Sequence, residues 1–210
     1  MNQQPGLLAT MLSKLQALRP GAPQPSGAVR EAAVLLALTR ESVPRVVLTR
    51  RADHLNSHSG EVALPGGMWE PSDSNLIHTA LRESWEEVAM PPEAVDIRAQ
   101  LPYRLTRLGV GVTPFVGVIP PNQSFIANPE ELDSIFHVPI TFFLDQGNAG
   151  SFPQAIDGQE LWFPCYDFEE YRIWGMTLNV LLDFLNITMD ANIHLPYPEE
   201  LDELQLVDPT

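Results

Sequence analysis

The sequence predicts a single α/β domain, either α+β or an α/β/α sandwich built on a mixed sheet. The apolar pattern changes along the chain in the order helix, strands, helix, strands, helix. The chain of 210 residues suits one domain of ordinary size or slightly more. Hydrophobic residues make up 44% of it, which is typical of a protein with a full core.

The first predicted elements are a helix and then short strands. Apolar residues recur at helical spacing over 6–18, and the Pro/Gly/Ser-rich segment 19–27 reads as a linker. Apolar, β-rich runs then predict short strands at 32–38, 45–50 and 60–64. The third strand ends in Pro65-Gly66-Gly67, a tight turn that brings the chain to the next helix.

The second helix is predicted over 75–88, and Pro91-Pro92 ends it or starts a short further helix. Strands return after it, with candidates at 95–106, 111–119 and 159–168. Between these strands, 130–145 reads as a turn followed by a short helix or a bent strand. A strongly apolar helix over 177–188 completes the order.

We expect three parts in the chain: an N-terminal helix and linker over 1–29, a main domain over 30–190, and an acidic tail over 191–210. The tail after Asn192 is rich in proline and acidic residues, so we expect it to be loosely ordered. The N-terminal helix packs either on the main domain or on a second subunit. A homodimer is therefore one of the two arrangements that we expect.

The charge of the chain restricts its partners. The formal net charge is −15, from 27 acidic and 12 basic residues. This balance argues against non-specific binding to nucleic acid or to an anionic membrane, since both need a basic surface. Lys14 is the only lysine, so an anionic ligand must be held by a few arginines, by backbone amides or by a metal ion.

The single cysteine, Cys165, excludes an intrachain disulfide and is compatible with a reducing compartment. No ligand pattern surrounds it, so we interpret it as a small buried apolar residue. No apolar run approaches the length of a membrane span, and the N-terminus lacks the order of a signal peptide. We therefore expect a cytoplasmic protein.

The second helix carries three carboxylates within five residues, which is unfavourable on its own. Glu83 and Glu87 lie about 40° apart around the helix, and Glu86 lies about 60° to the other side of Glu83. Their repulsion costs a few tenths of a kcal/mol per pair. A solvated acidic face is one explanation. The other is a metal site, because Mg²⁺ and Mn²⁺ prefer hard carboxylate oxygens, and the Gly66-Gly67 turn brings backbone to the same place.

Residues 64–90 resemble the Nudix box, whose pattern is G-x5-E-x7-R-E-U-x-E-E-x-G-U, with U a bulky apolar residue. The matching residues are Gly67, Arg82, Glu83, Glu86, Glu87 and Met90. Asp73 occupies the early Glu position, and the gap from Asp73 to Arg82 is one residue longer than in the pattern. Ser84 replaces an apolar residue, and Ala89 replaces the glycine.

A second block, 46–67, resembles the additional motif of coenzyme A-type Nudix hydrolases, L-L-T-x-R-S-x3-R-x3-G-x3-F-P-G-G. The residues that match in register are Leu48, Thr49, Arg51, Gly60, Pro65, Gly66 and Gly67. Ala52 stands for Ser, Asn56 for Arg and Leu64 for Phe. The segment 171–177, YRIWGMT, also looks like this subfamily.

The resemblance implies a Nudix-type α/β/α sandwich over 30–190 that hydrolyses a nucleoside diphosphate linked to another group, with Mg²⁺ or Mn²⁺ as cofactor. The implied metal ligands are Glu83, Glu86 and Glu87, with Arg82 orienting the cluster and Asp73 as a possible partner of Arg82. One of these carboxylates, or Glu130 or Glu131 in a later loop, takes the proton from the attacking water.

The second block implies coenzyme A or an acyl-CoA as the substrate, cut to 3′,5′-ADP and phosphopantetheine. The implied substrate-binding residues are Arg51, Gly66 and Gly67. Arg50 should point to the other face of its strand, and His54 and His58 either bind phosphate or are structural. Tyr171, Trp174 and Met176 either line a pantetheine or adenine pocket or belong to the core.

Two other functions remain open. Because Ala52 and Asn56 depart from the motif, the substrate can instead be another nucleoside diphosphate derivative, such as ADP-ribose, NADH or a dinucleoside polyphosphate. A non-catalytic module that senses a nucleotide is a third hypothesis, although a complete metal cluster is more than binding alone requires. All three imply a small nucleotide as the partner.

Overall fold

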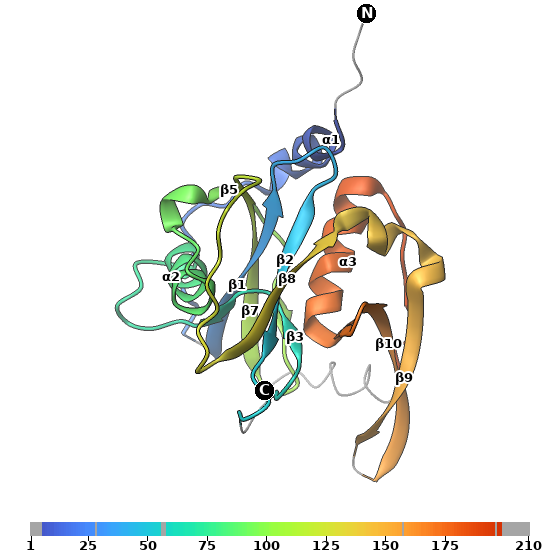
Figure 1. Ribbon diagram of the computed structural model, residues 1–210. Coiled ribbons are helices and arrows are strands. Elements are labelled where there is room, and N and C mark those ends of the chain that lie inside the picture. Colours follow the sequence, from blue (N-terminus) through green and yellow to red (C-terminus); the bar gives the residue numbers. More distant parts are fainter. Residues whose placement is uncertain (1–5, 28, 56–57, 157, 196, 199–210) are drawn as a thin grey trace, which may run out of the picture.

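The computed structural model describes residues 6–27, 29–55, 58–156, 158–195 and 197–198. It confirms the predicted α/β/α sandwich with a mixed central sheet (Figure 1). Helix α2, Leu76–Val88, covers one face of this sheet, and helix α3, Gly175–Met189, covers the other. No helix in the described part of the chain is long and apolar enough to span a membrane.

The main sheet has eight strands. Its central path follows the order β3, Val62–Ala63; β2, Arg45–Arg51; β1, Arg30–Thr39; β7, Val110–Ile119; and β5, Asp96–Gln100. The other strands are β4, Gly66–Met68, on β1; β6, Arg104–Leu105, on β7; and β8, Leu132–Pro139, on β2. β1 and β7 run parallel over their whole length, and the other pairs are antiparallel, so the sheet is mixed as predicted.

One flank of β1 is shared between two strands. β4 pairs with its first half, at Ala32, Ala33 and Val34, and β2 pairs near its end, at Leu38. The amide of Leu35, between them, donates to the carbonyl of Pro65 at 2.8 Å. This arrangement brings the predicted Gly-Gly turn, now seen as the start of β4, into the sheet directly beside α2.

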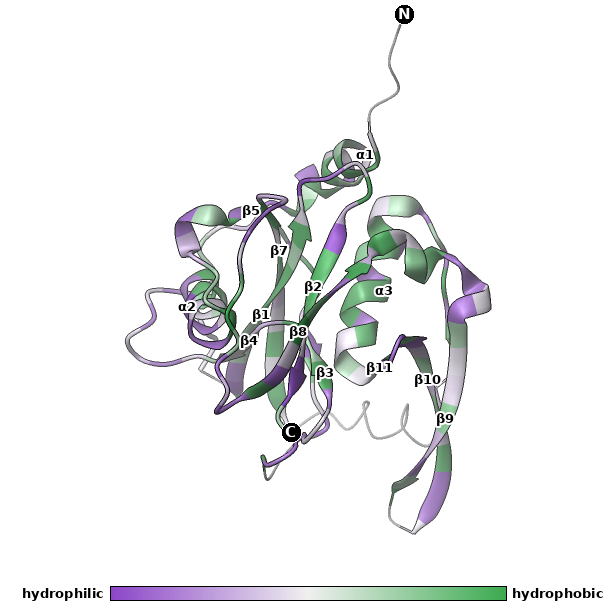
Figure 2. Cartoon of the chain, in the orientation of Figure 1, coloured by the Kyte–Doolittle hydropathy of each residue, from purple (hydrophilic) through white to green (hydrophobic). Residues whose placement is uncertain are grey.

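Two hydrophobic cores fill the space between the layers. Alternate β1 residues, Ala33, Leu35 and Ala37, face α2, while Leu36 and Leu38 face α3. Figure 2 shows hydrophobic residues along β1, β2 and β7 and on α3. A strand buried on both faces explains why 32–38 is almost continuously apolar rather than alternating.

The predicted N-terminal helix is present as α1, Leu7–Lys14, continued by a 3₁₀ helix over Leu15–Leu18. Met11 and Leu15 are fully buried in the core on the α3 side. The linker that follows is held on α2, since Pro23 accepts a hydrogen bond from the amide of Leu76 at 2.9 Å. Of the two arrangements expected for this helix, the described contacts show packing on its own chain.

One predicted strand needed correction, and two open predictions are resolved. The strand expected over 95–106 is interrupted after Gln100 and resumes as the two-residue β6. The segment 130–145 contains both expected alternatives in series, strand β8 and then a 3₁₀ helix over Ile140–Leu144. Pro91 and Pro92 follow the end of α2, and a 3₁₀ helix covers Pro92–Ala94. Another 3₁₀ helix covers Gln146–Asn148.

Besides β4, two strands were not predicted. β9, Ala149–Ile156, and β11, Tyr171–Trp174, flank the predicted strand β10, Gln159–Phe168, in a separate antiparallel sheet (Figure 1). This small sheet packs beside α3. The apolar pattern of the sequence did not predict this second sheet.

The beginning of the tail is more ordered than expected. Ile193 is buried, and its amide and carbonyl both hydrogen-bond the side chain of Asn186 in α3, at 2.8 and 3.0 Å. The hydroxyl of Tyr197 donates to Asn179 at 2.9 Å. The expectation of loose order is therefore wrong for these two residues, and residues 196 and 199–210 of the tail lie outside the described residues.

Candidate active site

Both ends of helix α2 are capped, so its boundaries, and with them the residues on each face, are well defined. The side chain of Asn75 caps the first turn by accepting from the amide of His78 at 3.0 Å. At the other end Ala89 adopts a left-handed conformation, with φ of 53°, and its amide bonds the carbonyls of Ser84 and Trp85. Ser84 is buried, and its hydroxyl donates to the carbonyl of Ala80 at 2.7 Å. The serine thus satisfies its polar group within the helix at a position where the Nudix box has an apolar residue.

Asp73 and Arg82 form a buried ion pair, which confirms the predicted partnership despite the extra residue between them. Arg82 donates from Nε to Oδ1 at 2.9 Å and from Nη2 to Oδ2 at 3.0 Å. Thr79 and the amide of Glu70 also donate to Asp73, at 2.9 and 3.1 Å. Burial alone would raise the pKa of Asp73, but these hydrogen bonds outweigh it and lower the pKa to about 2.

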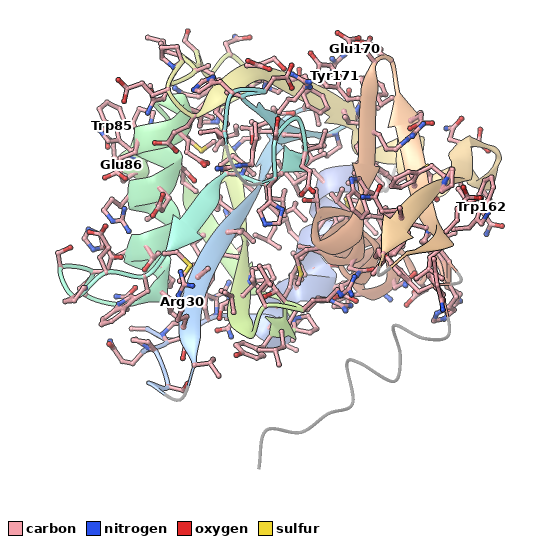
Figure 3. The ribbon with its side chains drawn as sticks, turned by 90° about the horizontal axis from the view of Figure 1, so that it is seen from below. Arg30, Trp85, Glu86, Trp162, Glu170 and Tyr171 are labelled. Carbon is pink, nitrogen blue, oxygen red and sulfur yellow. The ribbon has the colours of Figure 1, made fainter. Side chains whose placement is uncertain are left out.

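Arg82 also joins the other parts of the cluster. Its Nη1 lies 3.0 Å from Oε1 of Glu83 and 2.9 Å from Oε2 of Glu86, and its Nη2 donates to the carbonyl of Met68 in β4 at 3.0 Å. Figure 3 shows Glu86 with Trp85 on the outer side of α2. Arg82 therefore ties α2 to β4 and holds the carboxylates of Glu83 and Glu86 on one guanidinium.

The two glycines allow β4 to approach the helix. The amide of Gly66 donates to Oε2 of Glu87 at 3.0 Å. A Cβ atom at Gly67 would stand 2.4 to 2.6 Å from the carboxylate atoms of Glu83, and one at Gly66 would stand 2.3 Å from the carbonyl oxygen of Ala33. A side chain at Gly66 would clash with the backbone of β1, and one at Gly67 would displace the Glu83 carboxylate.

Burial and mutual repulsion perturb the carboxylates on this face. Burial raises the pKa of Glu87 to about 8, with the negative charges of Glu131 and Glu83 adding to the effect and the Gly66 amide and Arg51 opposing it. Burial also raises the pKa of Glu83, against the attraction of Arg82, and Glu86 and Glu131 add to the rise. Glu131 thus contributes to a concentration of negative charge that the α2 sequence alone did not reveal.

The loop before β8 brings Glu131 to the cluster. The amide of Asn128 donates to the carbonyl of Glu87 at 2.8 Å, and its side-chain amide donates to Oε1 of Glu131 at 3.2 Å. The carbonyl of Glu131 accepts from the amide of Ala52, just after β2, at 2.9 Å. Glu130 is exposed, and its carbonyl lies 3.2 Å from Nε2 of His54. Of the two loop acids, Glu131 is the one whose charge acts on the helix carboxylates.

The two neighbouring arginines of β2 have different surroundings. Arg50 is paired with Asp53 at 2.6 Å and with Asp133. Arg51 is close enough to Glu87 to oppose the rise in its pKa. The Nε atom of Arg51 is buried and has no hydrogen-bond partner among the described residues. Arg51 therefore retains a hydrogen-bond donor beside the carboxylates, whereas Arg50 is already neutralised.

Other predicted site residues lie away from this cluster. Tyr171 stacks on Phe136 with ring centroids 3.7 Å apart, and Trp174 packs edge-on against Phe152 and Phe163. Figure 3 places Tyr171 far from Glu86. The packing matches their interpretation as core residues, and Met176 packs on the same core.

Two further residues singled out in the sequence have no contact with the cluster among the described interactions. Nδ1 of His58 lies 2.8 Å from Oε2 of Glu61. Cys165 is buried as predicted, and Asn56 lies outside the described residues.

The donor groups fit a hard divalent cation. Glu83 and Glu87 are carboxylates with raised pKa values, and the backbone of Gly66 and Gly67 lies against them. A bound cation would relieve their repulsion. Within the described ranges no three His, Cys, Asp or Glu side chains are arranged to hold a metal, since the Glu83 carboxylate is turned toward Arg82 and that of Glu87 toward the Gly66 amide.

A family model described as "NUDIX domain" matches residues 29–174. The chain belongs to the Nudix family. Its members are hydrolases of phosphoric anhydride bonds and generally use a divalent metal ion such as Mg²⁺ or Mn²⁺. The predicted Nudix membership is thus confirmed, and the box lies on β4, the following loop and α2.

Curated Nudix relatives match most of the chain. Proteins from Salmonella paratyphi B and Salmonella newport, both called "Uncharacterized Nudix hydrolase NudL", are 41% identical over 172 residues, which is 81% of this chain and 88% of theirs. A MutT/Nudix family protein from Enterococcus faecalis has a similar structure, with a TM-score of 0.54 and 16% identity over 81% of this chain and 66% of that one. This structure supports the fold alone.

Proposed function

We propose that this Nudix hydrolase is a coenzyme A diphosphatase, which hydrolyses the pyrophosphate bond of coenzyme A or an acyl-CoA to 3′,5′-ADP and the (acyl-)phosphopantetheine. One observation supports it most. The motif residue Arg51 lies near Glu87 of the Nudix box, and its buried Nε has no hydrogen-bond partner among the described residues. A guanidinium in that position suits the phosphate of a substrate whose pyrophosphate reaches the same carboxylates.

Two of the departures from the coenzyme A motif are at buried positions, so they count little against this substrate. Ala52 is fully buried and Leu64 is 4% exposed. Both therefore alter packing behind the site rather than a surface that meets the substrate. Asn56, which replaces a charged residue of the motif, lies outside the described residues.

In the proposed mechanism, Glu83 and Glu87 would hold the cation with Glu86 as a further ligand, and Arg82 keeps the carboxylates of Glu83 and Glu86 in place. When bound, the cation would supply positive charge that neutralises the pyrophosphate and stabilises the negative charge developing on oxygen in the transition state. Arg51 and the backbone of Gly66 and Gly67 orient the phosphates. Glu131 takes the proton of the attacking water, because it is the loop acid whose charge acts on Glu83 and Glu87.

A substrate panel tests the proposal. The purified protein is incubated with Mg²⁺ or Mn²⁺ and with coenzyme A, ADP-ribose or NADH in parallel, and the products are separated. We expect 3′,5′-ADP and phosphopantetheine from coenzyme A. Intact coenzyme A alongside rapid cleavage of ADP-ribose would overturn the substrate assignment and favour the second candidate, a Nudix pyrophosphatase for another nucleoside diphosphate derivative, which the Ala52 and Asn56 departures motivate.

Neighbouring arginines provide a matched pair of variants. Arg51→Gln should raise KM for coenzyme A by about 10-fold or more, since each lost charge-assisted bond costs about 1.5–3 kcal/mol. Arg50→Gln removes the same charge from an arginine already paired with acids, so KM should change little. Glu83→Gln should abolish turnover, and full activity of that variant on every substrate would contradict the catalytic assignment.

A further inference from the structure

A second polar site lies away from the carboxylates, where the N-terminal helices pack against β5 (Figure 1). It is a half-open cavity of about 420 Å³, a size suited to a small molecule. Its lining residues are Arg19, Pro20, Ile77, Asp96, Ile97 and Arg98. A smaller hollow of about 260 Å³ along α1 shares Arg19 and Arg98, so the two arginines stand at the centre of one groove.

A β-bulge gives Arg98 its position. Ile97 pairs with Gly117 and Ala99 pairs with Val116, so Arg98 is an extra residue between two successive pairs of the β5–β7 ladder. Bulges of this kind change the direction of a side chain and are common at sheet edges, and β5 is the last strand of the central path. The bulge sets Arg98 in the wall of the groove.

The guanidinium of Arg98 is only partly satisfied. Its Nη2 atom is paired with Asp96, but its Nε atom is buried and has no hydrogen-bond partner in the described part of the chain. Buried donors nearly always have a partner, either in the protein or in ordered water, so this one is available to a polar group that enters the groove. Within the described residues, Nε of Arg51 in the hydrolytic site is the other arginine Nε in this condition.

The charge of the groove favours an anion. Two arginines face it, against one acid, and Asp96 already has Arg98 and Arg40 as ion-pair partners. Arg19 is exposed and forms no ion pair with any described residue. Surplus positive charge is unusual on a chain of net charge −15, and an anion close to both arginines would gain from charge-assisted hydrogen bonds.

We propose that this groove binds the oxyanion group of a small molecule, a phosphate or a carboxylate, between Arg98 and Arg19. This site is separate from the hydrolytic one. Its lining includes Ile77 of α2 but none of the carboxylates of the Nudix box. The inference does not depend on the proposed substrate, because it rests on the bulge, the unpaired Nε and the charge of the groove alone.

Calorimetric titration of the full chain in metal-free buffer tests this proposal, with inorganic phosphate as one probe and succinate as the other. We expect saturable binding of at least one probe, and the one that binds assigns the oxyanion as phosphate or carboxylate. Arg98→Gln and Arg19→Gln should each weaken binding by about 10-fold or more, the effect of one lost charge-assisted contact. Arg98→Lys should also weaken it, because lysine keeps the charge but lacks the Nε donor.

Arg107→Gln serves as the matched control. It removes the same charge from an exposed arginine outside the groove and should not change the titration. Arg51→Gln removes the charge from the hydrolytic site and reports any binding of phosphate there. Absence of saturable binding by both probes, or loss of binding in Arg51→Gln but not in Arg98→Gln, would overturn the proposal. Arg19 is exposed, so its variant should fold normally and remains informative even if Arg98→Gln unfolds.

Discussion

The carboxyl group of Glu87 is buried, and burial disfavours its charged form. The stability of the fold therefore depends on pH. The pKa of Glu87 is about 8 in the folded protein, above the ordinary value of 4.5. Between these two values the unfolded chain has lost the proton while the folded chain keeps it. The free energy of unfolding therefore falls as the pH rises through this window.

Glu87→Gln should remove this dependence. We expect the metal-free variant to be more stable than the wild type at pH 8, by roughly 2 kcal/mol or more, because each unit of pKa shift corresponds to about 1.4 kcal/mol. Glutamine retains an oxygen for the Gly66 amide, so the two proteins should be nearly equal at pH 5. Urea unfolding at both pH values measures the difference. Glu86→Gln, at an exposed carboxylate, is the control, and an equal gain at both pH values would contradict the prediction.

Asp73→Asn should have the opposite effect. Asp73 has a pKa of about 2, below its ordinary 3.8, so its ionised form stabilises the fold above pH 3.8, and this contribution is lost as the pH falls through 2. Removing its charge leaves Arg82 without its buried partner, and we expect a loss of about 3 kcal/mol at pH 7 by urea unfolding. Thr79→Val removes one hydrogen bond to the ionised Asp73 and should cost about 1.5 kcal/mol, the lower end for a hydrogen bond to a charged group. A loss no greater than that in Asp73→Asn would argue against the buried pair.

At the scale of elements, the end of α2 explains one departure from the Nudix box. Ala89 stands where the pattern has glycine, and its φ of 53° is in the left-handed region that favours glycine. The conformation is held by the bonds of its amide to Ser84 and Trp85. The helix therefore ends correctly, but at a conformational cost.

Ala89→Gly should stabilise the protein by about 1 kcal/mol, because glycine adopts this conformation without the steric cost of a Cβ atom. The change in urea midpoint measures the gain. Ala80→Gly, the same substitution inside α2, is the control and should destabilise by about 1 kcal/mol or more. A loss of stability in Ala89→Gly would show that the left-handed conformation does not limit stability here.

Elements differ in how well the sequence predicts them. The helix expected over 75–88 is found at Leu76–Val88, because apolar spacing, the Asn75 cap and the following prolines all indicate the same boundaries. β9 has the sequence AGSFPQAI, whose glycine, proline and small residues are atypical of strands. It forms because β10 pairs with it along its length. That pairing is a tertiary contact and leaves no local pattern.

The same distinction holds within the site. The helical period predicts that Glu83 and Glu87 share a face, and the motif predicts that Arg51 is close to them. The role of Glu131 depends on backbone hydrogen bonds that join its loop to α2 and to the end of β2. Backbone hydrogen bonds do not require a particular side chain. The sequence alone therefore could not distinguish Glu131 from Glu130.

At the scale of the whole molecule, the N-terminal helix belongs to the core. Met11 and Leu15 are fully buried together with residues of α3 and the sheet. We therefore propose that α1 folds with the main domain, although the domain was first expected to begin at residue 30. In this view the segment 19–27 is not a free linker, because it is hydrogen-bonded to the start of α2.

Leu15→Ala should therefore destabilise the entire protein. Emptying a fully buried leucine position typically costs 2–5 kcal/mol, and we expect about 3 kcal/mol in urea unfolding, within a single cooperative transition. Leu108→Ala, at a leucine that is 81% exposed, should change stability by less than about 0.5 kcal/mol. An early separate transition in the wild type, or no loss in Leu15→Ala, would indicate that α1 is an independent appendage.

The parallel pairing of β1 with β7 has a kinetic consequence. The two strands are joined through β2, β3, β4, α2, β5 and β6, so their ladder closes only after the chain has formed a long loop. Closure of such loops is entropically unfavourable and slows folding in proteins with many non-local contacts. Recovery of hydrolytic activity after dilution from denaturant should then follow the slowest refolding phase, because no segment carries the hydrolytic residues by itself.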